Sequence, residues 1–259
     1  MLARRVASGL PPAAVEIVLT GSTSRGVADE RSDIELLVVS ETLPPLEDCL
    51  AALGFGDHWT LDGTFWWTGG QVDGEDVEVI WWPRDRVERR VADILAAEVF
   101  DHERIRTAEA LVHGVGLRTA GWLEDWQLRL SAYPARLAER VIADAAESWH
   151  ESPRSAVGLL RPGERLPLAV QLVEDAENVL RILFALNQAW EPGWKRIARS
   201  LEPLAVKPER TAERIDAALA ALDLRAMREL VRDTLVLAPD TPAVLRARLE
   251  TDTLLEALA

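Results

Sequence analysis

The sequence predicts an α+β N-terminal domain, a small mixed sheet flanked by helices, followed by an all-α C-terminal helical bundle. Over roughly the first hundred residues, short β-branched runs alternate with turn residues, a pattern typical of strands. Apolar residues then recur at spacings of three and four, which is typical of amphipathic helices. The change falls between Glu98 and Thr107, so we expect domains at residues 1–104 and 105–259.

Turn and proline signals place the elements of the N-terminal domain. Pro44 and Pro45 open a helix, because proline is tolerated in a first helical turn. Asp73-Gly74 favours a tight hairpin between two strands, and Pro83 ends the second of them. A short polar helix is expected after Gly21-Ser22. The expected strands are 15–20, 34–40, 64–72 and 76–82, and the longer helices are 44–53 and 84–98.

The C-terminal domain is expected to contain eight amphipathic helices. Proline and glycine clusters separate them, because these residues interrupt helices. The expected helices are 105–113, 121–130, 134–149, 167–187, 193–201, 208–222, 224–237 and 241–258.

Composition narrows the class of protein. The 259 residues are 48% hydrophobic and 28% charged, as in ordinary globular proteins. The net charge is −14, which argues against a nucleic-acid polymer as partner, because phosphate backbones require basic surface. An acidic surface fits a small ligand better, particularly a cationic one.

Several features indicate a cytoplasmic protein. Cys49 is the single cysteine, so intrachain disulfides are impossible and a reducing compartment is expected. No apolar run approaches the roughly 20 residues of a membrane span. Pro11 and Pro12 interrupt the apolar start, so a secretory signal is not expected. The four histidines show no metal-ligand spacing, which disfavours a zinc site.

The stretch 15–39 carries the strongest functional signal. Side chains alternate along a strand, so Asp33 and Glu35 share one face while Ile34 points to the other. Two adjacent carboxylates repel each other unless a cation lies between them. Oxygen ligands of this kind suit Mg²⁺ bound to a substrate's phosphates. Gly21-Ser22, at the start of the short helix upstream, is a candidate phosphate-binding site.

Together with a later carboxylate, this stretch resembles a family signature. Gly21-Ser22 is followed after ten residues by Asp33-Ile34-Glu35-Leu36, and Glu78 stands between valines on a later strand. The pattern resembles that of the nucleotidyltransferase superfamily, which includes aminoglycoside nucleotidyltransferases, minimal nucleotidyltransferases and polymerase-beta-like enzymes. Thr20 departs from it, because an apolar residue is usual at that position.

The resemblance implies a role for each residue. Asp33 and Glu35 would hold one or two Mg²⁺ ions against the triphosphate of ATP or another nucleoside triphosphate. Glu78 would ligate the second ion or take the acceptor's proton. The phosphates would be bound by Gly21, Ser22 and neighbouring backbone N–H groups, together with Arg25.

Structural alternatives exist for these residues. Asp33 could cap a local turn, Glu35 and Glu78 could lie on a solvated strand face, and Arg25 could form a surface ion pair. Asp76 points the same way as Glu78 and could replace it as third carboxylate.

The predicted helix 167–187 offers a second candidate surface. Glu174 and Glu177 lie off its apolar stripe, on the face that carries Arg181. They could bind an amine-bearing acceptor, with Lys195 reaching the triphosphate, or Glu177 could simply pair with Arg181 at i,i+4. The segment from this helix to Lys195 resembles helical domains that accompany some bacterial nucleotidyltransferases.

Two tryptophan pairs, Trp66-Trp67 and Trp81-Trp82, lie on predicted strands, so each pair must split its rings between the two sheet faces. One ring of each is expected in the core, and the other could cover a cleft.

The preferred interpretation is transfer of AMP from ATP to a hydroxyl of a small polar molecule, such as an aminoglycoside or a related natural product. One alternative is a protein- or RNA-modifying enzyme of toxin–antitoxin type. Another is a non-catalytic nucleotide-binding scaffold. No membrane partner is expected, and the protein is expected to be a monomer or a homodimer.

Overall fold

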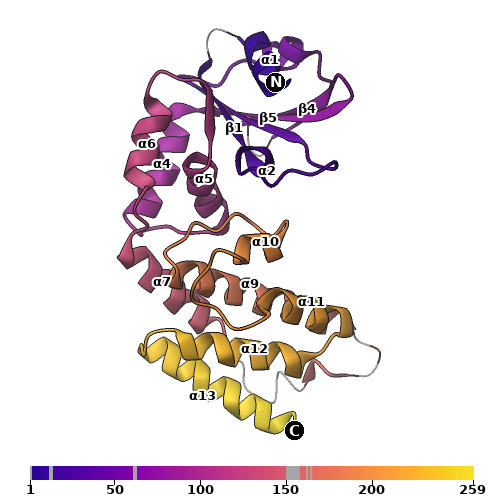
Figure 1. Cartoon of the computed structure of the whole chain (residues 1–259), viewed down its shortest axis with the longest axis vertical. Coiled ribbons are helices and arrows are strands. Elements are labelled where there is room, and N and C mark those ends of the chain that lie inside the picture. The colour runs from indigo at the N-terminus through magenta and orange to yellow at the C-terminus, as the bar shows by residue number, and fades with distance from the viewer. Residues whose placement is uncertain (1, 12–13, 61–62, 150–157, 162, 164) are drawn as a thin grey trace. The chain divides into compact units, whose positions relative to one another are not determined.

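A computed structural model describes residues 2–11, 14–60, 63–149, 158–161, 163 and 165–259. The chain forms two compact units, Met1–Ala132 and Tyr133–Ala259, which are described separately below. In Figure 1 the first unit runs from the indigo N-terminus into magenta, and the second ends in the yellow C-terminal helix.

The first unit is built on a six-stranded sheet in the order β3-β4-β5-β2-β1-β6. Strands β2 and β5 pair in parallel, and the other neighbours pair antiparallel, so the predicted mixed sheet is confirmed. The strands are β1 (Ala14–Thr20), β2 (Ile34–Ser40), β3 (Asp57–Trp59), β4 (Trp66–Val72), β5 (Glu75–Pro83) and β6 (Val115–Arg118).

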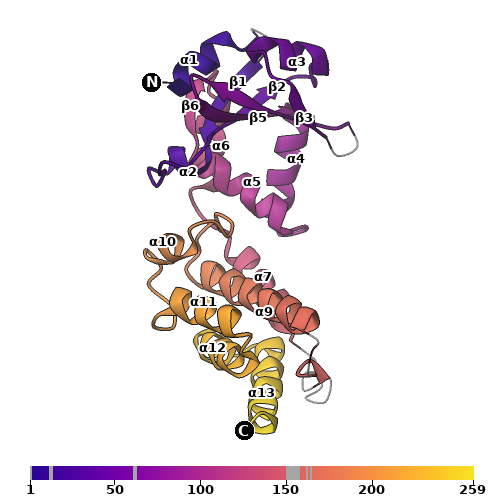
Figure 2. The same ribbon diagram turned by 90° about the vertical axis from the view of Figure 1, so that its right-hand side faces the viewer.

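Helices cover the two faces of this sheet in different ways (Figure 2). One face carries the core, where Leu36, Val79 and Trp81 pack with residues of α1 (Leu2–Gly9) and α3 (Leu46–Leu53). The opposite face contacts three helices: α4 (Arg84–Leu95), α5 (His102–Val112) and α6 (Trp122–Leu130). The four-residue helix α2 (Gly21–Ser24) lies between β1 and β2 in the chain and contacts both.

Three elements of this unit were not predicted: α1, β3 and β6. Strand β6 pairs with β1, and the helices α5 and α6 on either side of it contact β1 as well. The first unit therefore ends at Ala132 rather than at the expected boundary of 104, because sheet pairing holds α5, β6 and α6 to the N-terminal domain.

The described residues of the second unit form helices joined by turns and loops, with no strand among them, as predicted for the C-terminal part. The long helix α9 (Arg165–Leu186) packs on α7 (Ala135–Glu147), α11 (Thr211–Ala221) and α12 (Leu224–Leu237). Helix α13 (Pro242–Ala257) packs on α7 and α12, and the short α10 (Ile197–Leu201) contacts α11. Among the described residues, no helix has the length and apolar character needed to span a membrane.

An ion pair is buried inside this unit. The Arg228 Nε lies 3.1 Å from Asp175 Oδ2, and both side chains are almost fully buried. Trp149 Nε1 and Gln171 Nε2 each donate to Asp175 Oδ1 at 3.0 Å. The pair joins α9 to α12, and breaking it would leave an uncompensated buried charge.

Candidate active site

Two of the three predicted carboxylates, Glu35 and Glu78, lie on one row that crosses the sheet, and Asp33 directly precedes β2. Glu35 of β2 is the register partner of Glu78 of β5, and Thr20 of β1 is the partner of Glu35. Neighbouring strands are about 4.8 Å apart, so the two glutamates start side by side on the same face. The parallel pairing of β2 and β5 explains this, because both glutamates stand near the N-terminal ends of their strands.

Gly21 makes room for the Glu35 carboxylate. Its φ of +69° is in the left-handed region, where a side chain is unfavourable. A Cβ built at Gly21 would lie 2.4 Å from Glu35 Oε2 and 2.5 Å from Glu35 Cδ. The glycine of the Gly-Ser turn therefore serves two purposes: it permits the turn from β1 into α2, and it lets the carboxylate lie directly against the turn's backbone.

Side chains of the turn and of β1 hold the start of β2. The Thr23 hydroxyl donates to the Asp33 carbonyl, and the Thr20 hydroxyl donates to the Glu35 carbonyl, both at 3.3 Å. Thr20, the departure from the family pattern, is thus buried and hydrogen-bonded within the sheet. The turn before Asp33 is closed by Asp29 and Ser32, whose hydroxyl donates to Asp29 Oδ1 at 2.9 Å.

Arg25 is held by a carboxylate from α5. Its Nη1 lies 2.8 Å from Glu109 Oε1, and the two side chains are 20% and 6% exposed. Ser22, one turn earlier, is buried. A guanidinium carries five N–H donors and Glu109 engages one nitrogen, so the ion pair orients Arg25 without exhausting its capacity for an anion.

The chemistry of the donor set suits a hard divalent cation. Asp33, Glu35 and Glu78 offer only carboxylate oxygens, which magnesium and calcium prefer. Among the described residues, no three His, Cys, Asp or Glu side chains are grouped closely enough to hold a metal. The register that pairs Glu35 with Glu78, and the space that Gly21 leaves for the Glu35 carboxylate, are compatible with such an ion. A bound cation would offset the repulsion between the carboxylates.

Two further residues flank the row. Asp76, the alternative third carboxylate, is exposed and accepts a hydrogen bond from Gln71 Nε2 at 3.0 Å, across the hairpin. On the other side of Glu78 lies its register partner Gly69. A Cβ at Gly69 would lie 2.5 Å from Trp67 Cη2, so the indole of Trp67 lies against the strand beside Glu78.

Comparison with known proteins identifies the family of this chain. The model of the nucleotidyltransferase domain family matches residues 2–140, which is more than half of the chain. The chain belongs to the nucleotidyltransferase domain family. It is therefore a nucleotidyltransferase enzyme, and domains of this family use a nucleoside triphosphate and a divalent metal.

Other comparisons are more distant. A solved structure described as a nucleotidyltransferase-like protein from Exiguobacterium sibiricum is similar over 99% of this chain and 72% of the other, with 13% identity and a TM-score of 0.40. No curated protein sequence shows a significant match.

The nucleotidyltransferase domain contains a buried carboxylate that sequence reasoning missed. Glu16 of β1 is fully buried, and its Oε1 accepts the backbone N–H groups of Ala120 at 2.7 Å and Trp122 at 3.3 Å. Burial raises the pKa of Glu16, and these two hydrogen bonds oppose the rise. Glu16 thereby ties the start of α6 to the sheet. An acidic residue inside the apolar run Val15–Leu19 was the available signal.

The remaining predicted residues belong to the second unit. Glu174 and Lys195 are exposed, and Glu177 is half-buried on α9. Arg181 bonds to Asp144 of α7 at 2.6 Å and to Asn178 at 3.3 Å. The partner of Arg181 is thus an aspartate of the neighbouring helix, in place of the i,i+4 pair with Glu177 considered from the sequence.

Proposed function

We propose that this nucleotidyltransferase transfers AMP from ATP, with Mg²⁺, to a hydroxyl of a small polar molecule such as an aminoglycoside or a related natural product. The observation that carries the proposal is the pairing of Glu35 with Glu78 on one sheet face, where Gly21 leaves room for the Glu35 carboxylate. The family supplies nucleotidyl transfer itself. ATP, magnesium and the acceptor are the proposed parts.

The proposed mechanism assigns a role to each of these side chains, and two roles to Glu78. Asp33, Glu35 and Glu78 would hold the metal, which supplies positive charge against the triphosphate when bound. Ser22 and Arg25 would contact phosphate oxygens and fix the triphosphate in line with the acceptor. The acceptor oxygen would attack the α-phosphorus, the bond to the β-phosphate would break, and pyrophosphate would leave. The carboxylate of Glu78 would also accept the hydroxyl proton.

The acceptor assignment rests on charge and accessibility. Glu174 is exposed and Glu177 is half-buried, whereas Asp175 between them is buried and pairs with Arg228. Accessible carboxylates attract an aminated acceptor, and the chain's charge of −14 acts in the same direction. We include Lys195, exposed in the same unit, as a contact to the triphosphate.

A paired set of variants tests the donor half. Asp33→Asn and Glu78→Gln each remove a proposed metal ligand with little change of volume. Both should abolish the stabilisation by ATP plus Mg²⁺ in thermal unfolding, and they should abolish pyrophosphate release. The matched control is Asp76→Asn, an exposed carboxylate on the same strand, which should keep both. Loss of activity in Asp76→Asn together with an active Glu78→Gln would reassign the third carboxylate.

A substrate screen tests the acceptor half. Pyrophosphate release would be measured with each nucleoside triphosphate against aminoglycosides, nucleosides and purified proteins. Release that depends on an aminoglycoside and falls in Glu174→Gln/Glu177→Gln supports the proposal. Labelling of proteins or RNA instead would favour the toxin–antitoxin type of enzyme. A wild-type protein that gains no stability from ATP and Mg²⁺ would overturn the donor assignment.

A further inference from the structure

A second polar site lies at the other end of strand β5, away from the carboxylates. A cavity of about 480 Å³ is lined there by Pro83, Thr64, Leu43 and arginines of α4 and α5. Trp82 shares a strand face with Glu78 but stands four residues further along, a separation of roughly 13 Å at the rise of a β-strand. The cavity begins beyond Trp82, so it is distinct from the proposed metal site.

The lining is basic in a protein whose overall charge is strongly negative. Its described residues include four arginines (Arg86, Arg89, Arg90 and Arg104) against two aspartates. Two of these arginines are neutralised by neighbours: Arg89 pairs with Asp85 at 2.8 Å, and Arg104 pairs with Asp93 at 3.3 Å and with Asp101. The uncompensated charge therefore comes mainly from Arg86 and Arg90.

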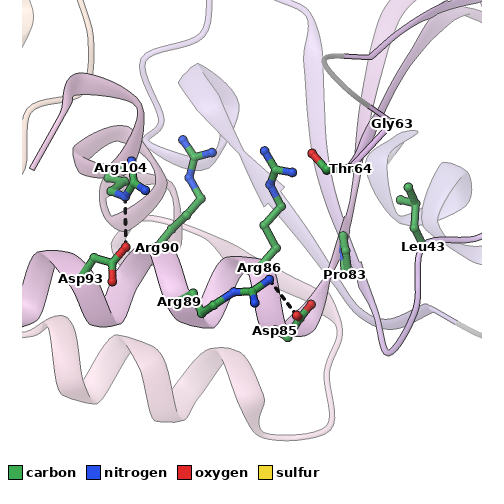
Figure 3. Close-up of a pocket in the computed structure, with 10 residues that line it drawn as sticks. All are labelled: Leu43, Gly63, Thr64, Pro83, Asp85, Arg86, Arg89, Arg90, Asp93 and Arg104. Carbon is green, nitrogen blue, oxygen red and sulfur yellow. Dashed lines mark hydrogen bonds and ion pairs between the residues drawn. The ribbon is translucent and has the colours of Figure 1, made fainter. Parts of the chain in front are cut away.

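Aromatic rings hold these two guanidiniums in place. The Arg90 guanidinium lies 4.6 Å from the Trp82 ring centroid, and that of Arg86 lies 5.4 Å from Trp82 and 5.5 Å from Phe65. Cation–π contacts of this kind fix a side chain without neutralising its charge. In Figure 3 both side chains leave α4 in the same direction, toward the side of the cavity that carries Thr64.

Arg90 is short of acceptors. Its Nε is buried and has no hydrogen-bond partner among the described residues, and its nearest carboxylate, Glu103, is 3.9 Å away. Burial, and then the proximity of Arg86, lowers the pKa of Arg90. Two like charges held side by side are unfavourable unless an anion lies between them. The partnerless Nε of Arg90 adds the cost of a buried donor without an acceptor.

We propose that this cavity binds the phosphate group of a phosphorylated small molecule between Arg86 and Arg90. A phosphate dianion matches two guanidiniums in charge and in hydrogen-bond geometry. The volume lies within the usual range of small-molecule sites, about 300–1,000 Å³, and exceeds the need of a bare phosphate. Leu43 and Pro83 supply an apolar wall for the rest of the ligand.

Calorimetric titration with inorganic phosphate and with ribose 5-phosphate, in the presence of EDTA, tests the proposal on the full chain. Both probes should bind, with the ester tighter. Arg86→Gln and Arg90→Gln should each weaken binding at least about tenfold, as expected for loss of a charge-assisted hydrogen bond. The variants Arg86→Lys and Arg90→Lys keep the positive charge but lose the forked geometry of the guanidinium. Their affinity for both probes should lie between those of wild type and the glutamine variants.

Arg129→Gln is the matched control. Arg129 also lies over a tryptophan ring in the first unit, 4.0 Å from the Trp126 centroid, and it is not part of the cavity. It should leave phosphate binding unchanged, as should Glu35→Gln in the metal site. Absence of binding by both probes, or equal weakening in the control, would overturn the site. Phosphate binding as tightly as the ester would overturn the assignment to a phosphorylated molecule.

Discussion

The substitution Gly21→Ala tests whether the absence of a side chain at Gly21 positions the Glu35 carboxylate. A methyl group at this position would lie 2.4 Å from Glu35 Oε2, whereas ordinary contacts of a Cβ begin at 3.4 Å. The carboxylate must therefore move by about 1 Å, and a displacement of that size in a catalytic constellation can cost about 10²-fold in rate. We expect a fall in kcat/KM of that order.

The stability cost of Gly21→Ala should be modest. The displaced atoms are the end of a flexible side chain, so the main penalty is the left-handed backbone conformation, about 1–2 kcal/mol for a non-glycine residue. Gly26→Ala supplies the control, because Gly26 has the same φ of +69° but a Cβ there would meet nothing within 4 Å.

Urea unfolding and steady-state pyrophosphate release would be measured on both variants. Equal destabilisation, with activity lost in Gly21→Ala alone, is the expected result. The double variant Gly21→Ala/Glu35→Ala should have the same activity as Glu35→Ala alone, because the two changes act through one carboxylate. A fully active Gly21→Ala, or an equal loss of activity in Gly26→Ala, would refute the reasoning.

Three further outcomes follow from buried groups. Cys49 is fully buried and its pKa is raised to about 12, so an aromatic disulfide reagent should label it only after unfolding; rapid labelling of the native protein would contradict its place in the core. The raised pKa of Glu16 favours folding of the protonated form, so its contribution is fully present below its unfolded pKa and is lost as pH rises through the higher folded pKa. Urea titrations from about pH 4 upward, starting near the unfolded carboxyl pKa, should show wild type losing stability relative to Glu16→Gln as the pH rises. Arg25→Gln and Glu109→Gln should each cost about 1.5–3 kcal/mol, and the double variant should cost less than their sum; strict additivity would show that the pair is not coupled.

The sequence was sufficient for elements whose cause is local. Strand β2 matches the predicted range 34–40, and α12 matches the predicted range 224–237. Predicted strand β5 differs by one residue at each end, because Glu75 and Pro83 still pair with their neighbours. Proline, glycine and apolar periodicity act over a few residues and can be read directly.

Elements defined by distant partners could not be predicted in this way. Strand β6 has only four residues, and it is a strand because β1 lies beside it. The three residues of β3 are all exposed, so no apolar pattern marks them.

The same limit applies to the site. The three carboxylates were proposed as site residues because a family pattern carries them, and that assignment stays a prediction. The partners of the nearby charges could not be predicted in this way. Arg25 meets Glu109 across 84 residues of sequence, and Glu16 meets Ala120 across 104. Contacts at such separations depend on the completed sheet, so no spacing rule within one segment reveals them.

The parallel pairing of β2 with β5 also constrains how the site forms during folding. Glu35 and Glu78 become neighbours only after the chain has passed through α3, β3 and β4. Closing this loop lowers the entropy of the chain before the stabilising contacts between β2 and β5 have formed. The β1–β2 pair, by contrast, is joined through α2 and can form early. The row of Glu35 and Glu78 should therefore appear late in folding, and a nascent chain that has not yet completed β5 would carry Asp33 and Glu35 without the third proposed carboxylate.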